Sequence, residues 1–392
     1  MVPGVLHGPG ADSPPGRSIS PEAIMTMSLE ELLGVRPPSQ RRSQVSFSFL
    51  FFSDVRKDIS SAEKYRFMRD VTLFGDAKGF TAVYIPERHF SEFGSIYANS
   101  AVMASYLIAQ TKRIRFRTAG ISLPLHHPAE VVEWWAMNDN LSGGRVDLGF
   151  GSGWAKPDFI YAPDAYEKRR AICAERIDIV RRLWRGETVP FPGPGGVDIP
   201  ITVYPRPVQK ELNVWLLITQ NADAFAQAGR LGFNVFTMLY GCDLDVLRDR
   251  IALYRQARKE AGHDPETGIV SLMLHTLVHR DMALVRRAVE APFKEYIRSS
   301  LDAHLAAGLG SAGKVSLKEI GEAEKNKILE YAYERYFSTG ALFGDVGDAR
   351  RMVEKTIAAG VNDIACLVDF GVDYPLVMES LPYLEKLVAD YC

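Results

Sequence analysis

Apolar segments of strand length alternate with amphipathic segments of helix length from residue 45 to the end of the chain. Short apolar runs rich in β-branched and aromatic residues predict strands, and apolar residues at helical spacing predict helices. The predicted strands are Val45–Ser53, Ala82–Pro86, Ile114–Leu123, Val146–Phe150, Val214–Thr219, Asn234–Leu239, Ile269–Val278 and Asp363–Val368. Each is followed by a predicted helix, so the chain contains eight strand–helix pairs.

Near-continuous apolar strands are typical of a parallel sheet that is buried on both faces. We therefore predict an α/β fold, and within it a TIM (β/α)8 barrel with rim insertions. The alternative is a doubly wound sheet with a second domain. The barrel is favoured because no linker-like stretch divides the body of the chain.

Three segments interrupt this alternation. Residues 1–44 are rich in Pro, Gly and Ser, which predicts a flexible leader before a barrel over residues 45–392. The leader either docks on a partner or is an inert tail. Residues 187–209, rich in Pro and Gly, predict a hairpin on the rim. Residues 292–338 predict a helical insertion, which is either a lid over the barrel mouth or a static pair of rim helices.

The composition excludes several classes of protein. With 392 residues and a formal net charge of −2, the chain lacks the basic patch of a nucleic-acid-binding or membrane-surface protein. Its apolar runs are too short to cross a bilayer, and its start does not resemble a secretion signal. The four cysteines are widely spaced, which favours a reducing, cytoplasmic location.

In a barrel, the loops that follow the strands carry the chemistry. The loop after the second predicted strand, Glu87–Gly94, contains an acid, a guanidinium, an imidazole and two aromatic rings. Such a set binds an anion, transfers a proton or packs against a planar ring. The structural alternative is that Glu87 and Arg88 pair with neighbours, while Phe90 and Phe93 fill the rim.

Two further loops are suited to a phosphate. The segment Gly149–Trp154 has the spacing GxGxG, which matches the dinucleotide fingerprint GxGxxG only weakly. A glycine loop at a barrel rim can still bind phosphate through its amides. Thr219–Asn221 precedes a predicted helix and offers hydroxyl, amide and helix N-terminal donors. Its structural alternative is helix capping.

We predict no metal site. His126 and His127 are adjacent in an extended segment, so their side chains point to opposite faces and do not bind one ion together. The motifs HExxH, GxSxG and GxxxxGK[ST] are absent from the sequence. Asp139 and Arg145, which flank a glycine turn, predict a structural ion pair.

Three of these motifs together resemble the bacterial luciferase-like monooxygenases, a family of flavin-dependent TIM barrels. The motifs are ERHFSEFG at 87–94, TAGISLPLHHP at 118–128 and NLSGGRVDLGFGSGW at 140–154. They occur in the family's order, each at a strand end, and the resemblance extends from residue 45 to the C-terminus. The segment YIPERHFSEFG, the helical insertion and the leader are most similar to the mupirocin-type subgroup of polyketide and nonribosomal peptide pathways.

The resemblance implies a two-component monooxygenase. Reduced FMN (FMNH2) from a separate flavin reductase would react with O2 to a C4a-peroxyflavin, which transfers one oxygen atom to an organic substrate. The substrate would be a small molecule or a carrier-protein-bound group in natural-product biosynthesis, and the protein would be a homodimer. The alternatives are a deazaflavin (F420)-dependent oxidoreductase and a non-catalytic flavin-binding pathway protein.

The matched motifs also imply roles for individual residues. His89 would hydrogen-bond near the reactive edge of the flavin or transfer a proton, while Arg88 and Glu87 orient the substrate or each other. A non-prolyl cis peptide at Ala119–Gly120 would support the flavin ring. The cofactor-binding residues implied around the ring and phosphate are Ala119, Gly120, Gly151, Ser152, Gly153, Trp154, Thr219 and Asn221.

Two positions depart from the family's luciferases. Arg88 stands where luciferases have the first of two adjacent histidines, and arginine is not a general base at neutral pH, so light emission is not expected. Ser152 matches an arginine that contacts phosphate in luciferases. Phosphate binding here would then depend on hydroxyls and backbone amides, together with a helix-borne cation such as Arg170.

Overall fold

The computed structural model describes residues 45–52, 56–91, 94, 96–306 and 321–391. The predicted leader, residues 1–44, lies outside the described residues. The glycine-rich interruption of the helical insertion, residues 308–313, and part of the loop that follows the second strand lie outside them as well.

Eight parallel strands form a closed barrel, so the predicted TIM barrel is confirmed. The barrel closes where Ser46 to Leu50 of the first strand pair with Asp363 to Leu367 of the last. In barrel order the strands are β1 (Ser46–Leu50), β2 (Ala82–Ile85), β3 (Arg115–Thr118), β5 (Val146–Gly151), β8 (Val214–Leu217), β9 (Asn234–Met238), β10 (Val270–Val278) and β12 (Asp363–Leu367).

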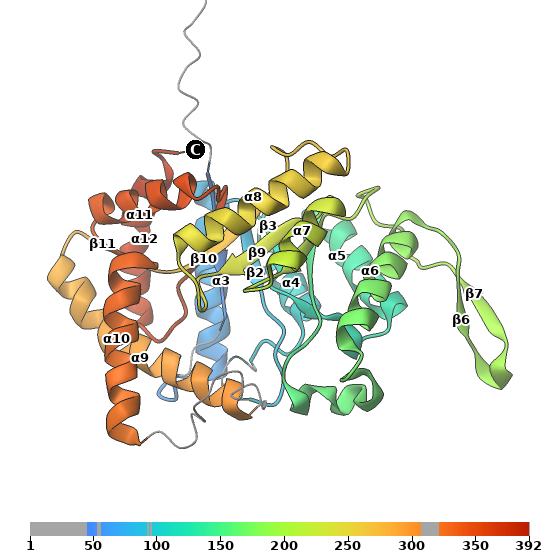
Figure 1. The fold of residues 1–392 in the computed structure, drawn as a ribbon, viewed down its shortest axis with the longest axis horizontal. Coiled ribbons are helices and arrows are strands. Elements are labelled where there is room, and N and C mark those ends of the chain that lie inside the picture. Colours follow the sequence, from blue (N-terminus) through green and yellow to red (C-terminus); the bar gives the residue numbers. More distant parts are fainter. Residues whose placement is uncertain (1–44, 53–55, 92–93, 95, 307–320, 392) are drawn as a thin grey trace, which may run out of the picture. The chain divides into compact units, whose positions relative to one another are not determined.

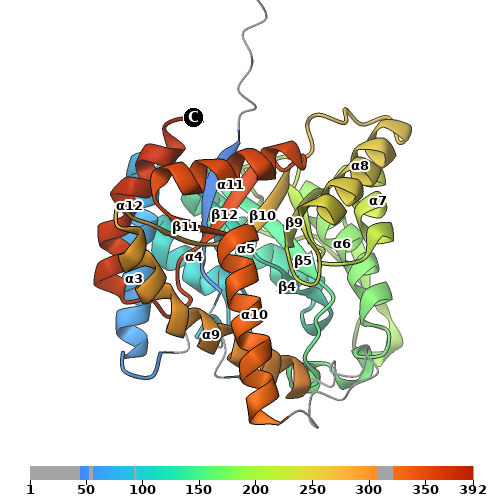
Figure 2. The ribbon, with the colours of Figure 1, turned by 60° about the vertical axis from the view of Figure 1, so that its left-hand side comes forward.

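Helices surround this sheet (Figures 1 and 2). They are α3 (Ser61–Lys78), α4 (Ser100–Ile108), α5 (Pro128–Ser142), α6 (Arg169–Arg185), α7 (Ala222–Arg230), α8 (Leu244–Glu260), α9 (Met282–Ala306), α10 (Glu322–Thr339), α11 (Val346–Ala358) and α12 (Tyr374–Val388). Local signals fix their ends. Ser60 and Glu63 form a capping box at the start of α3, and left-handed Gly79 ends it. Among the described residues, no helix is long and apolar enough to span a membrane.

Two strands differ from the prediction. The single strand expected over Ile114–Leu123 is divided into β3 and β4 (Ile121–Ser122), because the backbone turns at Gly120 with φ of 104°. A short strand, β11 (Ala341–Gly344), was not predicted. It pairs with the last four residues of β10, beyond those that pair with β9. Four apolar residues beside a helix end are too few to show a strand period.

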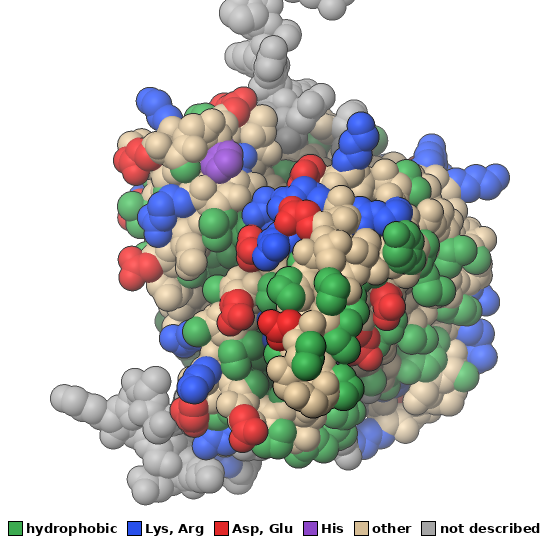
Figure 3. All heavy atoms as spheres, turned by 90° about the vertical axis from the view of Figure 1, so that its right-hand side faces the viewer, with side chains coloured by type: hydrophobic (Ala, Val, Ile, Leu, Met, Phe, Trp, Pro, Cys, Tyr) green, Lys and Arg blue, Asp and Glu red, His purple; other side chains and the backbone are tan. Residues whose placement is uncertain are grey.

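The predicted hairpin is formed by β6 (Val189–Pro192) and β7 (Asp198–Ile201), which pair antiparallel and project from the side of the barrel (Figure 1). It joins α6 to the start of β8, and its Phe191 packs against His127 of the loop after β4, at a centroid distance of 4.6 Å. On the face toward which it projects, hydrophobic side chains are interspersed with acidic ones (Figure 3). Val197 and Ile199 are exposed on the hairpin.

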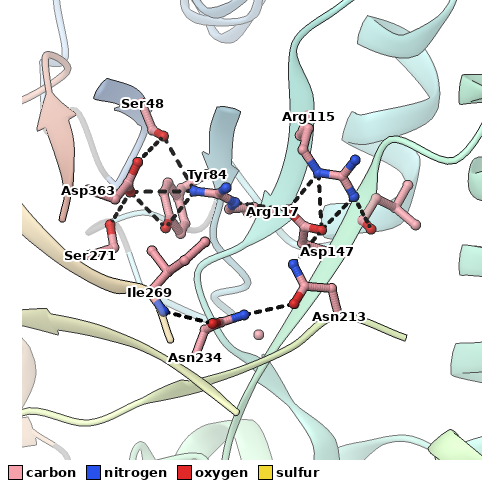
Figure 4. Close-up of polar contacts among 12 residues, drawn as sticks. Ser48, Tyr84, Arg115, Arg117, Asp147, Asn213, Asn234, Ile269, Ser271 and Asp363 are labelled. Atoms are coloured by element: carbon pink, nitrogen blue, oxygen red, sulfur yellow. Dashed lines mark hydrogen bonds and ion pairs between the residues drawn. The ribbon is translucent and has the colours of Figure 1, made fainter. Parts of the chain in front are cut away.

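A charged network fills the amino-terminal half of the barrel interior (Figure 4). Arg117 of β3 is 3 % exposed and lies between two fully buried carboxylates. Its Nε donates to Asp147 at 2.9 Å, and its Nη1 lies 3.4 Å from Asp363. Burial would raise the pKa of Asp147, but Arg117 and Arg115 outweigh it and hold that pKa below its ordinary value. Buried charges in this position require such pairing.

The ion pair expected between Asp139 and Arg145 is not formed, so that prediction is wrong. Asp139 instead accepts hydrogen bonds from the backbone amide and the side-chain amide of Gln209, at 2.9 and 2.7 Å. Arg145 donates to the carbonyl oxygens of Ile114 and Ser142, both at 2.8 Å. Each group therefore fastens a different loop, and their closeness in sequence did not indicate their partners.

Candidate active site at the carboxyl end of the barrel

The loop after β2 carries a buried acid between two imidazoles. Oε1 of Glu87 lies 3.4 Å from Nε2 of His89 and 3.0 Å from Nε2 of His126, and it accepts the backbone N–H of Ser122 at 3.3 Å. The side chains of Glu87, His89 and His126 are only 4 %, 7 % and 14 % exposed. The structure thus brings together two predicted catalytic residues and one, His126, that was not predicted to act.

Hydrogen bonding decides the charge of this cluster. Burial would raise the pKa of Glu87, but hydrogen bonds from His126 and His89 outweigh it and lower that pKa below its ordinary value. Burial would lower the pKa of His126, but the hydrogen bond and the charge of Glu87 raise it instead. Glu87 is therefore an ionised acceptor at neutral pH.

The two adjacent histidines diverge, as the sequence predicted. The ring of His126 turns toward Glu87 and packs edge-on against Trp134, at a centroid distance of 5.7 Å. His127 accepts the N–H of Ala129 at 3.3 Å and so caps α5. Arg176 holds the segment from outside by donating to the carbonyl oxygen of His126 at 2.6 Å. His126 and His127 therefore serve different elements.

Arg88 lies in an aromatic slot. Its guanidinium carbon is 4.2 Å from the centre of the Phe52 ring and 5.8 Å from that of Trp154. Burial lowers the pKa of Arg88 to about 10, which leaves it charged at neutral pH. A Cβ on Gly94, whose φ is 86°, would come within 2.4 Å of the Arg88 side chain. Arg88 thus links the loops that follow β1, β2 and β5.

The residue after His89 has a strained backbone. Phe90 has φ of 52° although it is neither glycine nor asparagine, and its side chain is 54 % exposed. This left-handed conformation costs a bulky residue about 1–2 kcal/mol. Tyr161 packs against both rings, at centroid distances of 5.4 Å from His89 and 5.5 Å from Phe90. Strain of this kind concentrates at functional sites.

Glycines after β3 and β5 have different roles. A Cβ on Gly149 would lie 2.3 Å from the carbonyl oxygen of Thr118, so this glycine is required for strand packing. A Cβ on Gly151 would meet no atom within 4 Å. Gly151 is paired with Ser122 of β4, directly after the Ala119–Gly120 turn. Open space therefore lies beside the backbone at the end of β5.

The prediction of a cis peptide bond at Ala119–Gly120 is wrong. Among the described residues, the single cis peptide bond is Tyr204–Pro205. Gly120 turns the chain through its positive φ of 104° instead, which only glycine adopts readily. Ala119 is buried, and its amide donates to the carbonyl oxygen of Ile85 at 2.8 Å. The sequence contains no signal for the peptide geometry itself.

The predicted phosphate corner, Thr219–Asn221, lies directly before α7. Asn221 caps α7 by accepting the N–H of Asp223 at 3.0 Å, which is the structural alternative considered for it. The carbonyl oxygen of Thr219 accepts a hydrogen bond from Arg250 of α8 at 3.1 Å. Arg250 was not predicted, because nothing in the sequence of α8 indicates which loop it reaches. Arg170, the cation suggested from sequence, lies in the first turn of α6.

The other predicted residues lie on the segment after β5. Ser152, Gly153 and Trp154 lead into a short 3-10 helix, η2 (Lys156–Tyr161). Gly153 has φ of 73°, and a Cβ there would come within 3.0 Å of the ring of Phe159. One oxygen of Asp158 on η2 is buried and has no hydrogen-bond partner within the described part of the chain. Burial raises the pKa of Asp158 to about 6, against the opposing charges of His89 and Arg88.

A closed (β/α)8 barrel with glycine loops and a buried acid–histidine cluster at its carboxyl end has the organisation of a barrel enzyme. A sequence profile of the luciferase-like monooxygenases matches residues 45–362. The chain therefore belongs to the luciferase-like monooxygenase family, as its motifs predicted.

Several individual relatives agree with this assignment. The alkanal monooxygenase alpha chain of Photorhabdus luminescens is 24 % identical over 306 residues, which cover 74 % of this chain and 81 % of that protein. The 4-hydroxyprotoasukamycin monooxygenase of Streptomyces nodosus subsp. asukaensis is 34 % identical over 114 residues, or 29 % of this chain and 30 % of its own length. The chain also spans 61 % of the uncharacterized protein y4vJ of Sinorhizobium fredii, at 25 % identity over 55 % of this chain. For these last two relatives, the match covers less than two thirds of their length.

Solved structures agree on the fold. The monooxygenase RslO1 from Streptomyces bottropensis superimposes with a TM-score of 0.74 at 21 % identity, covering 88 % of this chain and 100 % of that one. The oxygenating constituent of 3,6-diketocamphane monooxygenase from Pseudomonas putida, in complex with FMN, gives 0.70 at 18 % identity, covering 88 % and 98 %. An F420-dependent secondary alcohol dehydrogenase gives 0.66 at 16 % identity, covering 89 % and 99 %.

Proposed function

We propose that the protein is an FMNH2- and O2-dependent monooxygenase that transfers one oxygen atom to an organic substrate. The observation that carries this proposal is the open space beside Gly151, next to the Gly120 turn and the buried Glu87 cluster. Family membership supports a flavin at this end of the barrel. A similar structure that contains FMN is a Baeyer–Villiger monooxygenase by its description.

The residues at this end fit a flavin mononucleotide. Gly120 and Gly151 leave the backbone at two neighbouring strand ends without side chains, and only one of them, Gly120, would meet a neighbour at 3.1 Å if it carried a Cβ. A planar ring needs backbone of this kind for close approach. The amides of residues 151–154, the hydroxyl of Ser152 and the N-terminus of α7 are donors suited to the phosphate, and Arg250 brings a cation to that corner.

Bound reduced flavin supplies the activation of O2, and the protein supplies position and proton control. We propose that His89 holds or moves a proton at its ring nitrogen, with Glu87 fixing the ring. Arg88 keeps a positive charge beside the Trp154 loop and orients an anionic or polar group there. The apolar rings of Phe90 and Tyr161 exclude water from His89.

Further features of this proposal come from the resemblance alone. They are the flavin reductase partner, a small-molecule or carrier-protein-bound substrate, natural-product biosynthesis, the mupirocin-type subgroup and the homodimer. The cytoplasmic location comes from the spacing of the cysteines. Each stays a prediction.

The proposed function is tested by supplying purified protein with FMN, a flavin reductase, NADH and O2 and recording the flavin spectrum in stopped flow. We expect binding of FMNH2 and a spectral change that requires O2. His89→Ala should retain the thermal stability of the wild type but lose about tenfold or more of coupled oxygen transfer, because acid–base groups contribute that much or more. Binding of reduced F420 without binding of FMNH2 would instead indicate the deazaflavin alternative.

A pair of glycine substitutions tests the cofactor position. Gly151→Ala should change the free energy of unfolding by no more than about 0.5 kcal/mol, since its Cβ meets no atom. It should nevertheless weaken FMN binding about tenfold, measured by fluorescence titration. Gly149→Ala should cost about 1–3 kcal/mol of stability, because its Cβ would collide with the Thr118 carbonyl. Wild-type FMN affinity in Gly151→Ala would place the flavin elsewhere.

A further inference from the structure

We propose that His126 is a positioning residue of the active site. Through the shared acceptor Glu87, it fixes the orientation and tautomer of His89, so that Nδ1 of His89 is the ring atom that takes up a proton. The inference rests on the proposed oxygenase function, because His89 acts there. The proposal adds His126, on the loop after β4, to Glu87 and His89, on the loop after β2.

The geometry makes both imidazole rings hydrogen-bond donors to Glu87. Nε2 of His126 and Nε2 of His89 both face Oε1 of Glu87, at 3.0 and 3.4 Å. An ionised carboxylate only accepts hydrogen bonds, so both Nε2 atoms carry a proton. A neutral His89 in this tautomer keeps its lone pair on Nδ1. A carboxylate that fixes the tautomer of a catalytic imidazole acts in the same way in acid–histidine catalytic sites.

His126 is the stronger of the two imidazole contacts to Glu87. Its distance to Oε1 is 0.4 Å shorter than that of His89, from 3.4 and 3.0 Å. Without it, the buried carboxylate would keep one weak imidazole contact and the Ser122 amide. An under-solvated buried carboxylate binds a proton or rotates to find another donor. Either change would release His89 from the Nε2-protonated state.

His126 itself is held rigidly enough for this role. Trp134 of α5 packs against its ring, and Arg176 of α6 binds its carbonyl oxygen. The charged groups that face its imidazole are Glu87, Glu130 of α5 and Arg176. Glu87 and Glu130 favour the imidazolium form, and Arg176 opposes it. Across the cluster, the charges of His89 and Arg88 both act on Asp158 of η2.

The proton transfer is balanced within this cluster. Nδ1 of His89 takes one proton from the reacting group, and its Nε2–H bond to Glu87 is retained, so the ring becomes an imidazolium ion. Asp158, one oxygen of which has no hydrogen-bond partner among the described residues, provides a negative charge toward that cation when it is ionised. The proton later leaves from the same Nδ1 atom, and His89 is unchanged after one turnover.

The first test needs no cofactor. Imidazole 15N NMR of the flavin-free protein should show neutral His89 protonated at Nε2. His126→Phe keeps an aromatic ring beside Trp134 but removes the donor, and should shift His89 toward the Nδ1-protonated tautomer. His126→Gln retains an N–H donor and should restore the wild-type spectrum. His127→Asn, which keeps a cap for α5, is the matched control and should leave His89 unchanged.

The second test uses the enzyme supplied with FMNH2. His126→Phe should lower kcat about tenfold with little change in KM and should shift the acid limb of the pH profile, while His126→Gln recovers most of the loss. An unchanged His89 tautomer in folded His126→Phe would overturn the proposal. So would stoichiometric binding of Zn2+ by the purified wild type that displaces both imidazole protons. If His126→Phe shifted the His89 tautomer but the wild type transferred no oxygen to any substrate, the positioning role of His126 would stand and the proposed function would be wrong.

Discussion

Replacing Arg117 by methionine is expected to lower the free energy of unfolding by about 3–5 kcal/mol, the usual effect of removing one partner from a buried ion pair. Arg117 is the cation that lies between Asp147 and Asp363 in the barrel interior. Asp147 would keep Arg115 as a partner at 2.6 Å. Among the described residues, Asp363 would keep only hydroxyl donors, from Ser46, Ser48, Ser271 and Tyr84, around a fully buried charge. The loss is measured by urea denaturation.

A second substitution separates charge from packing. Asp363→Asn alone should also destabilise the barrel, because it leaves the Arg117 charge with one carboxylate instead of two. The double variant, Arg117→Met with Asp363→Asn, should lose clearly less than the sum of the single variants, since it leaves no unpaired charge at Asp363. Additive losses would show that Arg117 contributes through its packing against Trp215, at 4.4 Å, and not through its charge.

This network shows what the strand pattern did and did not reveal. Near-continuous apolar strands were enough to predict the barrel. A strand that is buried on both faces is apolar at most of its positions, and one or two charged residues do not hide that pattern. Arg117, Asp147 and Asp363 nevertheless lie in predicted strands, where a charge must have a buried partner. The sequence contained that signal, but three strands far apart in the chain had to be placed before the partners could be identified.

Only part of the active site was predicted from the sequence. Motif order placed Glu87 and His89 at a strand end, and the structure confirms that location. His126 was set aside because only its neighbour His127 was considered as a partner. Strands β2 and β3 are adjacent in the barrel, so the loops that follow them meet at one edge. Applying that adjacency to the predicted barrel would have brought His126 beside Glu87.

Backbone geometry and the partners of long side chains could not be predicted from the sequence. The geometry at Ala119–Gly120 depends on how the surrounding strands hold the turn, and the same two residues are compatible with more than one solution. Arg250 reaches Thr219 over a distance in sequence of 31 residues. A flexible arginine on a helix surface has many possible partners, and only the packed structure selects one.

The free energy of unfolding of the wild type is expected to fall between pH 7 and pH 4 by about 3 kcal/mol more than that of His275→Phe. His275 of β10 is buried, and neither ring nitrogen has a hydrogen-bond partner among the described residues. Phe293, Tyr296 and Phe370 surround it edge-on at centroid distances of 4.7, 4.8 and 5.3 Å. Burial lowers the pKa of His275 to about 3, whereas an unfolded histidine has its ordinary pKa near 6.5.

The sign follows from proton binding. Between pH 6.5 and 3 the unfolded chain binds a proton at His275 that the folded protein excludes, so acidification favours unfolding by about 1.4 kcal/mol per pH unit. Asp158 and His126 act in the opposite direction, because their pKa values are raised in the folded protein. Both are present in the wild type and in His275→Phe, so their contributions cancel in the difference. Urea unfolding of the two proteins from pH 7 to pH 4 therefore isolates His275. If the free energies of unfolding of the two proteins fell in parallel with pH, His275 would take up a proton in the folded protein as readily as in the unfolded chain, and the prediction would be wrong.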